Sequence, residues 1–246
     1  MNATTVDPAE VERFARIADE WWDADGKFAP LHRLNPARIG FVRDRVAAHF
    51  NRDPLKPAPL AGLRLLDIGC GGGLVCEPMR RLGADVVGID AAEQNVAVAR
   101  LHAERMGLTI DYRADAAERL CAAGDAFDVV LALEVVEHVA DPDLFLRCCA
   151  DLVKPGGVLV LSTLNRTAKA FALGIVGAEY VLGWLPRGTH DWRKFLKPSM
   201  LARPLRAAGL TVEALAGLAY SPITGRWRID PDDLDVNYLM VATKAA

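Results

Sequence analysis

Two glutamates and a histidine lie in one short apolar stretch, LALEVVEHVADP, at residues 131–142. Glu134, Glu137 and His138 follow the spacing i, i+3, i+4, which places three side chains on one face of a helix. Two carboxylates and an imidazole can bind a divalent cation such as Mg²⁺, Mn²⁺ or Zn²⁺. An imidazole can also act as a general base without any metal. The third interpretation is a polar helix start with no role in catalysis. The residues around this stretch must decide between the three interpretations.

A glycine-rich turn, LLDIGCGGG, directly follows a short apolar run that predicts a strand. Such a turn lets the backbone approach a ligand closely at the start of a helix. The dinucleotide pattern G-x-G-x-x-G would need a glycine at the position of Leu74. Instead an acid, Asp67, precedes Gly69 and Gly71. A carboxylate at this turn repels a pyrophosphate and suits a ligand that carries an ammonium group.

A second acid stands at the end of the next predicted strand, DVVGID. Asp90 is placed there to accept hydrogen bonds from both hydroxyls of a ribose. A ligand with a ribose, an α-amino group and no phosphate is S-adenosylmethionine, which we therefore predict as the cofactor. Asp115 follows the third predicted strand, and it either contacts the adenine edge or is a solvated loop acid.

Short apolar runs alternate with amphipathic segments from residue 64 onward, and this order predicts the elements that position these residues. Strands are expected at 64–68, 85–90, 109–114, 127–133 and 158–163. Alternating strands and helices indicate an α/β fold with a parallel sheet covered on both faces. Because such folds bind ligands at the carboxyl ends of their strands, the stretch after Leu133 should lie beside the cofactor. The segments 210–218 and 236–243 read as strands that could pair antiparallel at the sheet edge.

The chain reads as one domain, 1–246, with four parts. These are an N-terminal helical part and linker (1–62), a cofactor-binding core (63–163), a helical insert (164–209) and C-terminal strands (210–246). Helices are expected to begin at Asp7-Pro8-Ala9-Glu10 and at Asn35-Pro36, where a capping side chain precedes a proline.

Composition narrows the class of protein. A net charge of −3 gives no reason to expect nucleic acid as a partner. Five cysteines, an odd number, do not suggest a disulfide framework, and reduced thiols indicate a cytoplasmic protein. There is no secretory signal pattern and no apolar run of about 18 to 20 residues, so we expect no membrane-spanning segment.

The insert after the fifth predicted strand is apolar and basic. Residues 166–198 hold six Arg and Lys against two acids, a local charge of +4, with tryptophan and phenylalanine interleaved. Such a segment suits peripheral contact with an anionic membrane, which would be the inner face of the cell membrane. A lid helix packed on the domain or on a partner is the alternative.

Several motifs resemble those of known methyltransferases. LLDIGCGGG, VVGID, FDVVLALEVVEHV and LVKPGG resemble class I S-adenosylmethionine-dependent methyltransferases. Four further stretches are similar to the ubiquinone biosynthesis O-methyltransferase family, whose members are also called 3-demethylubiquinol 3-O-methyltransferases or 2-polyprenyl-6-hydroxyphenol methylases. These stretches are EWWDADGKFAPLHRLNPAR, STLNRT, GAEYVLGWLPRGTHDWRKFLKP and DVNYLM. The resemblance covers nearly the whole chain.

The resemblance implies a Rossmann-like fold and methylation of phenolic hydroxyls on polyprenylated ubiquinone precursors, at one or two pathway steps. It places cofactor contacts on Arg38, Gly69, Asp90 and Leu133. We expect Glu134 and His138 to be needed for catalysis. Two alternatives stay open: a methyltransferase for a small soluble catechol, which the long apolar insert disfavours, and a non-catalytic member of a ubiquinone-biosynthesis complex.

Overall fold

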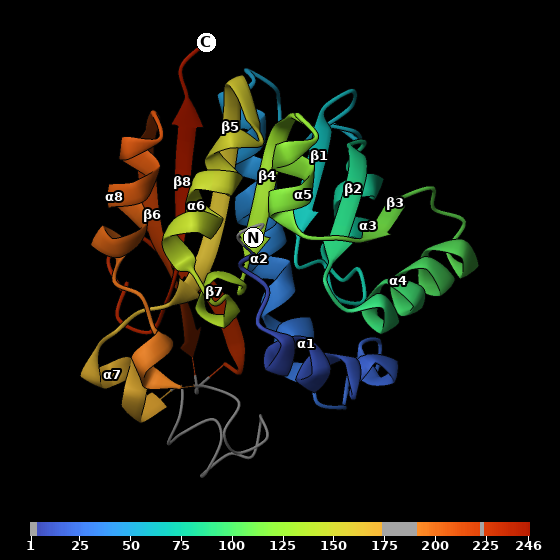
Figure 1. Ribbon diagram of the computed structural model, residues 1–246, viewed down its shortest axis with the longest axis horizontal. Helices are drawn as coiled ribbons and strands as arrows, with labels where there is room; N and C mark the ends of the chain where they lie inside the picture. The colour runs from blue at the N-terminus through green and yellow to red at the C-terminus, as the bar shows by residue number, and fades with distance from the viewer. Residues whose placement is uncertain (1–3, 174–190, 222–223) are drawn as a thin grey trace.

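The computed structural model describes residues 4–173, 191–221 and 224–246 and is built around one eight-stranded sheet (Figure 1). The strand order is β3-β2-β1-β4-β5-β8-β6-β7. The strands are β1 (Arg64–Ile68), β2 (Asp85–Asp90), β3 (Asp111–Ala114), β4 (Phe127–Leu133), β5 (Val153–Leu164), β6 (Leu210–Ser221), β7 (Arg226–Asp230) and β8 (Asn237–Lys244).

The first five strands pair in parallel, and the last three add antiparallel pairings. The predicted α/β fold with a mostly parallel sheet and an antiparallel C-terminal edge is thus confirmed. The predicted antiparallel pairing of segments 210–218 and 236–243 is confirmed, as β6 with β8, but their place in the sheet differs from the expectation. β8 lies inside the sheet, between β5 and β6, and the edge is β7, a strand that the sequence pattern did not reveal because its residues alternate charged and apolar over only five positions.

Helices cover both faces of the sheet. Those of the described chain that are longer than one turn are α1 (Pro8–Ala15), α2 (Ala29–His49), α3 (Cys76–Arg81), α4 (Glu93–Arg105), α5 (Ala117–Ala122), α6 (Pro142–Asp151) and α8 (Pro198–Ala207). The shorter ones are η1 (Ala18–Glu20), η2 (Val136–His138), α7 (Ala168–Ala170) and η4 (Trp192–Lys194).

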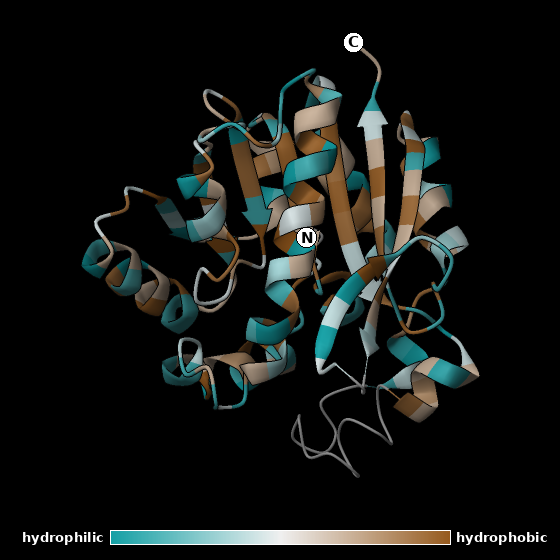
Figure 2. Ribbon diagram, turned by 180° about the vertical axis from the view of Figure 1, so that it is seen from behind, coloured by the Kyte–Doolittle hydropathy of each residue, from teal (hydrophilic) through white to brown (hydrophobic). Residues whose placement is uncertain are grey.

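Two apolar cores form because successive strand residues point to opposite faces. Leu65 and Leu131 pack with residues of α2, α3 and α4, whereas their neighbours Leu66 and Val130 pack with residues of α5, α6 and α8. Figure 2 shows the central strands as predominantly hydrophobic. Each fully buried Leu or Val contributes about 1.5–3 kcal/mol, so these cores hold the sheet that carries the site.

Helix α2 begins earlier than predicted. It starts at Ala29, with Pro30 in its first turn, and runs through Pro36 instead of starting after Asn35. Proline lacks an N–H, so one helical hydrogen bond is missing within α2. Arg38 consequently lies in the middle of the helix, where its side chain is buried, and not in the first turn, where a positive charge would oppose the helix dipole.

The parallel strands all end at the same side of the molecule, and α1 lies beneath their carboxyl ends in Figure 1. The chain entering α1 is tied to this edge by backbone: the N–H of Ala140 donates to the carbonyl of Thr5 at 2.8 Å. Among the helices that the structure describes, none is long and apolar enough to cross a membrane.

Candidate cofactor and acceptor site

A cavity of about 890 Å³ opens at the carboxyl ends of the parallel strands. Its wall joins α1 and α2 to the glycine turn, the ends of β2 and β4, and the segments around β6, β7 and β8. The structure places nearly all the predicted site residues on this wall: Arg38, Asp67, Gly69, Asp90, Asp115, Leu133, Glu134, Glu137 and His138. Gly71 lies outside the lining.

The glycine turn requires glycine at the two positions that the sequence singled out. Gly69 has φ +71° and Gly71 has φ +52°, a region that favours glycine. A Cβ on Gly69 would lie 2.5 Å from Cγ2 of Val135, and one on Gly71 would lie 2.4 Å from the ring of Trp21. Gly71 does not line the cavity, but its N–H donates a hydrogen bond to Oδ2 of Asp90, which does, at 3.0 Å.

Asp90 is held in one orientation by its neighbours. Its Oδ1 accepts from the N–H of Ala92 at 2.8 Å and from Nδ2 of Asn95 at 3.1 Å. Asn95 in turn accepts from the indole Nε1 of Trp21 at 2.9 Å. Burial raises the pKa of Asp90 above its usual range. Asn95 and Trp21 were not predicted as site residues; the only sequence signal for Trp21 was the family-like stretch that contains it.

Arg38 and Asp67 form a buried charged group under the cavity. Burial lowers the pKa of Arg38, while the carboxylates of Glu134 and Asp67 raise it. Burial raises the pKa of Asp67 to about 6, although the thiol of Cys76, 3.2 Å away, and Arg38 act in the opposite direction. Nε of Arg38 is buried without a hydrogen-bond partner among the described residues. An unpaired guanidinium donor beside a carboxylate fits the carboxylate and ammonium ends of S-adenosylmethionine.

Asp115 lies on the cavity wall, and its role as an adenine contact or as a solvated loop acid stays a prediction. Its Oδ1 accepts from the N–H of Ala116 at 2.8 Å and forms an ion pair with Arg119. Arg119 is largely exposed, so this pair leaves Asp115 at the boundary between the cavity and solvent.

Glu134 adopts a backbone conformation that the sequence did not indicate. Its φ is +58°, a left-handed value that costs a non-glycine residue about 1–2 kcal/mol. Neighbours hold it there: its N–H donates to the carbonyl of Ser162 at 3.0 Å, and its Oε1 accepts from Oγ of Ser162 at 2.6 Å. Nδ2 of Asn237 donates to both carboxylate oxygens at 3.0 and 3.1 Å. Ser162 and Asn237 are therefore site-positioning residues that sequence reasoning missed.

The prediction that Glu134, Glu137 and His138 share one face of a helix is wrong. The chain turns at Glu134, and only Val136–His138 form η2, a single 3₁₀ turn. Glu137 is buried and accepts from Oγ1 of Thr163 at 2.9 Å. Nδ1 of His138 lies 3.4 Å from Oε2 of Glu10 on α1. The three side chains thus point to three different sets of partners.

The positions of these three side chains decide whether they could bind a divalent cation together. Within residues 4–173, 191–221 and 224–246, no three His, Cys, Asp or Glu side chains come together as ligands of a metal ion. Glu137 has an oxygen, Oε1, that is buried without a hydrogen-bond partner in the same part of the chain. Burial, and then the negative charge of Glu134, raise the pKa of Glu137 to about 7.

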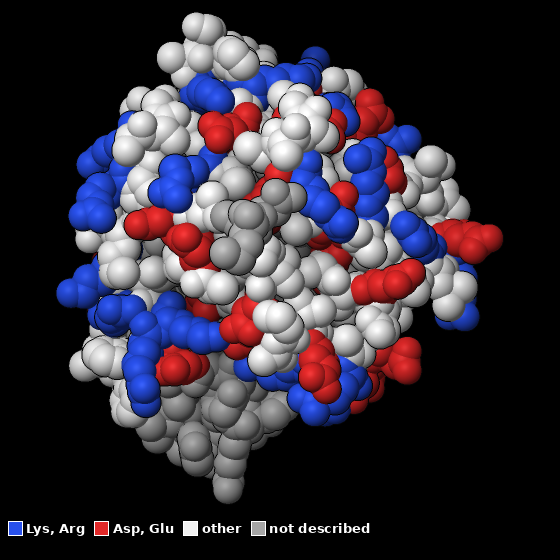
Figure 3. Space-filling view, in the orientation of Figure 1, with Lys and Arg blue, Asp and Glu red and all other residues white. Residues whose placement is uncertain are grey.

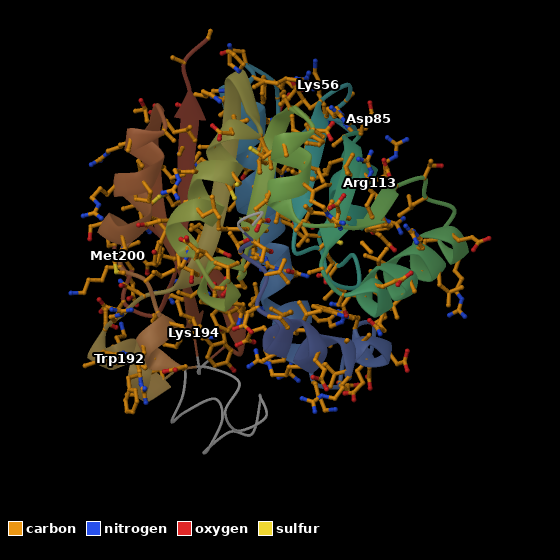
Figure 4. The ribbon with its side chains drawn as sticks, in the orientation of Figure 1. Lys56, Asp85, Arg113, Trp192, Lys194 and Met200 are labelled. Atoms are coloured by element: carbon orange, nitrogen blue, oxygen red, sulfur yellow. The ribbon has the colours of Figure 1, made fainter. Side chains whose placement is uncertain are left out.

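The insert is only partly described, because residues 174–190, which hold most of the predicted apolar segment, lie outside the described residues. On its two flanks large apolar side chains are exposed: Phe171 (46%), Leu173 (54%), Trp192 (39%) and, at the start of α8, Met200 (39%). Trp192 and Met200 are labelled in Figure 4. Basic side chains gather in the lower left of Figure 3.

Comparison with known sequences agrees with this geometry. A family model for a methyltransferase domain matches residues 37–215. The ubiquinone biosynthesis O-methyltransferase of Chelativorans sp. (strain BNC1) is 56% identical over 241 residues, covering 98% of this chain and 95% of its own. The protein of the same name from Cereibacter sphaeroides (strain ATCC 17025) is 56% identical over 245 residues, covering 99% of each chain.

A solved structure supports the fold. The magnesium protoporphyrin IX methyltransferase from Synechocystis PCC 6803, solved with bound S-adenosylmethionine, superposes with a TM-score of 0.64 over all of both chains at 18% identity. At this identity the likeness concerns the fold, which is one that can hold this cofactor.

Proposed function

Because the chain belongs to the ubiquinone biosynthesis O-methyltransferase family and is an S-adenosylmethionine-dependent methyltransferase, we propose that it methylates phenolic hydroxyls of polyprenylated hydroxybenzenes. The reactions would be the conversion of 3-demethylubiquinol to ubiquinol and the earlier step on 2-polyprenyl-6-hydroxyphenol. The observation that carries this proposal is one continuous cavity that is lined by the cofactor residues and by His138. Its volume of about 890 Å³ is near the upper end of the range for small-molecule sites.

Cofactor binding is assigned to the wall formed by α2, the glycine turn and β2. Arg38 would hold the carboxylate of S-adenosylmethionine, Asp67 its ammonium group and Asp90 its ribose hydroxyls. Leu133 would pack against adenine or sulfur, and Asp115 would reach the adenine edge. When bound, the cofactor supplies an electrophilic methyl group on a sulfonium.

The acceptor end is assigned to the loop after β4. A phenol with a pKa of about 10 is rarely ionised at neutral pH, so the acceptor must lose its proton for efficient transfer. His138 would take that proton. Glu134 interacts electrostatically with Arg38 and accepts a hydrogen bond from Asn237, and it would form the floor between the cofactor and the acceptor.

A divalent cation is the second candidate for activating the phenol. Its support is the pair formed by the half-buried Glu134 and the buried Glu137. The negative charge of Glu134 acts on Glu137, and Oε1 of Glu137 has no hydrogen-bond partner among the described residues. A cation would supply positive charge that stabilises the phenolate. The described side chains do not converge as three ligands, so we assign no step to it. Activity lost on chelation and restored by Mg²⁺ or Zn²⁺ would establish the cation; activity unchanged after complete metal removal would leave the proton to His138.

Peripheral contact with an anionic membrane, on the cytoplasmic side, is proposed for the flanks of the insert. The support is the exposure of Phe171, Leu173 and Trp192 beside Arg193, whose side chain is 90% exposed. A polyprenylated acceptor resides in the bilayer, so an enzyme at the surface would meet it there. Flotation with anionic liposomes tests this: a Phe171→Ser, Leu173→Ser, Trp192→Ser variant should float less, and unchanged flotation after deletion of 166–198 would refute it.

The experiment that tests the function is transfer of a labelled methyl group from S-adenosylmethionine to a prenylated catechol. The wild-type protein should give a methyl ether, and His138→Ala should lose rate roughly 10²- to 10⁴-fold while still binding the cofactor. Absence of transfer by the wild type, with the cofactor bound, would refute the proposed function.

A further inference from the structure

Glu10 joins three separate segments at the rim of the cavity. It lies on α1, its Oε2 is 3.4 Å from Nδ1 of His138 in η2, and its Oε1 accepts from Nζ of Lys194 in η4 at 2.9 Å. The guanidinium of Arg13, one turn along α1, lies 2.8 Å from Oε2. Lys194 is labelled in Figure 4, on the side of η4. The carboxylate thus sits between the predicted proton acceptor and two cations.

This carboxylate is not an ordinary surface charge. The side chains of Glu10 and His138 are only 15% and 16% exposed. The ring of Phe14, also on α1, stands edge-on to the imidazole of His138, with centroids 5.3 Å apart and planes at 82°. Glu10 and Phe14 together restrict both the position and the rotation of the His138 ring.

Polar contacts are among those that join α1 to the edge of the sheet. None of the residues Pro8–Ala15 is fully buried, so the helix has no side chain anchored wholly within a core. Its contacts at the sheet edge include Glu10 with His138 and Lys194, and Asp7 with Lys194 at 3.6 Å. The orientation of His138 is therefore tied to the placement of the N-terminal helix.

We propose that Glu10 is a positioning residue, whose carboxylate accepts from Nδ1 of His138 and so presents Nε2 to the acceptor when α1 is docked. The proposal rests on the proposed function, in which His138 serves the acceptor. An acid that fixes the tautomer of a histidine through Nδ1 is a recurrent device in enzymes. The separation of 3.4 Å is longer than an ordinary hydrogen bond, as such contacts often are before substrate binds.

The charges around the pair favour this assignment. Nζ of Lys194, at 2.9 Å, and the guanidinium of Arg13, at 2.8 Å, place two positive charges beside the carboxylate of Glu10. In the same segment as His138, Glu137 is an acid that also interacts electrostatically with the imidazole. Lys194 and Arg13 balance Glu10, so its carboxylate can stay ionised without an extra proton.

The test is Glu10→Gln in the full-length protein, with Glu12→Gln as the matched control. Glu12 lies on the same helix and is exposed, so the control removes the same charge without touching His138. Glu10→Gln should lower kcat about 10-fold or more while KM for S-adenosylmethionine and the melting temperature stay close to wild type. Glu10→Asp should restore part of the rate, and Glu12→Gln should match wild type.

A spectroscopic measurement separates this inference from the proposed function. The ¹⁵N imidazole resonances of His138, assigned by comparison with His138→Gln, should show a proton on Nδ1 in wild type and a shift toward the Nε2-protonated tautomer in Glu10→Gln. That change supports the inference even if no prenylated acceptor is methylated. Unchanged resonances, or a kcat for Glu10→Gln within twofold of wild type in an active enzyme, would overturn it.

Discussion

Nδ2 of Asn237 donates to both carboxylate oxygens of Glu134, at 3.0 and 3.1 Å, although 103 residues separate the two along the chain. This contact joins the first residue of β8 to the residue that follows β4. With Ser162 at the end of β5, it holds Glu134 in its left-handed conformation. The stretches STLNRT and DVNYLM thus meet on one carboxylate at the floor of the cavity.

Asn237→Ala should weaken both the site and the fold. It leaves the carboxylate of Glu134 with one fewer partner, and loss of a buried hydrogen bond to a charged group costs about 1–3 kcal/mol. We expect a lower free energy of unfolding by that amount and a lower kcat. Asn165→Ala is the control, because Asn165 is also buried but its amide donates to the carbonyl of Leu234. Equal loss of kcat in both variants would contradict the positioning role.

Gly69→Ala should abolish cofactor binding, and Gly62→Ala should not. The two glycines have nearly the same φ, +71° and +73°, so both substitutions carry the same backbone strain. Only at Gly69 does a Cβ meet another side chain, Val135, whereas nothing lies within 4 Å at Gly62. Calorimetric titration with S-adenosylmethionine and thermal melts would check this. Comparable binding by the two variants would show that the cofactor does not approach this turn.

Asp90→Ala should lower the affinity for S-adenosylmethionine by roughly ten- to a hundredfold, which corresponds to loss of hydrogen bonds to a charged group. Asp85→Ala is the control, since Asp85 starts the same strand and lies at its opposite end in Figure 4. Fluorescence or calorimetric titration measures both. If Asp90→Ala binds as tightly as Asp85→Ala, the ribose assignment fails.

The affinity for S-adenosylmethionine should fall as pH drops below about 6. Burial raises the pKa of Asp67 to about 6, and only its ionised form can pair with an ammonium group. In the unliganded protein, the stability of the fold changes with pH in the opposite direction. Because the pKa of Asp67 is higher in the native state, this state binds more protons than the unfolded chain, and the free energy of unfolding falls as pH rises from 3.8 toward 6. Titrations between pH 5 and 8 should show this affinity slope in wild type and a flat, weaker profile in Asp67→Asn. A pH-independent wild-type affinity would contradict the assignment.

Much of the sheet and of the cofactor wall could be predicted, because both depend on local signals. The glycine turn after β1 and the acid that ends β2 follow directly from strand and turn chemistry, and the structure places Asp67, Gly69 and Asp90 on one cavity. The i, i+3, i+4 spacing of Glu134 to His138 was misleading, since long-range hydrogen bonds from Ser162 and Asn237 override local helix preference.

The contacts that sequence reasoning missed all join residues that are far apart in the sequence. Glu10 reads as part of a helix start, and that helix does begin as predicted, with Asp7 accepting from the N–H of Ala9. Nothing in its spacing indicates a contact with His138, 128 residues away. Trp21 against the glycine turn is of the same kind. Such pairs are fixed by packing of whole elements, for which a single sequence holds no periodic signal.

The central claim is tested most directly by comparing kcat/KM for two catechols that differ only in the presence of a polyprenyl tail, presented in the same detergent or lipid. The purified wild-type protein should transfer the methyl group from S-adenosylmethionine to both catechols. Its kcat/KM should be at least about tenfold higher for the tailed catechol, because each buried CH₂ of the tail contributes about 0.8 kcal/mol to binding. Equal or higher kcat/KM for the tailless catechol would contradict the account.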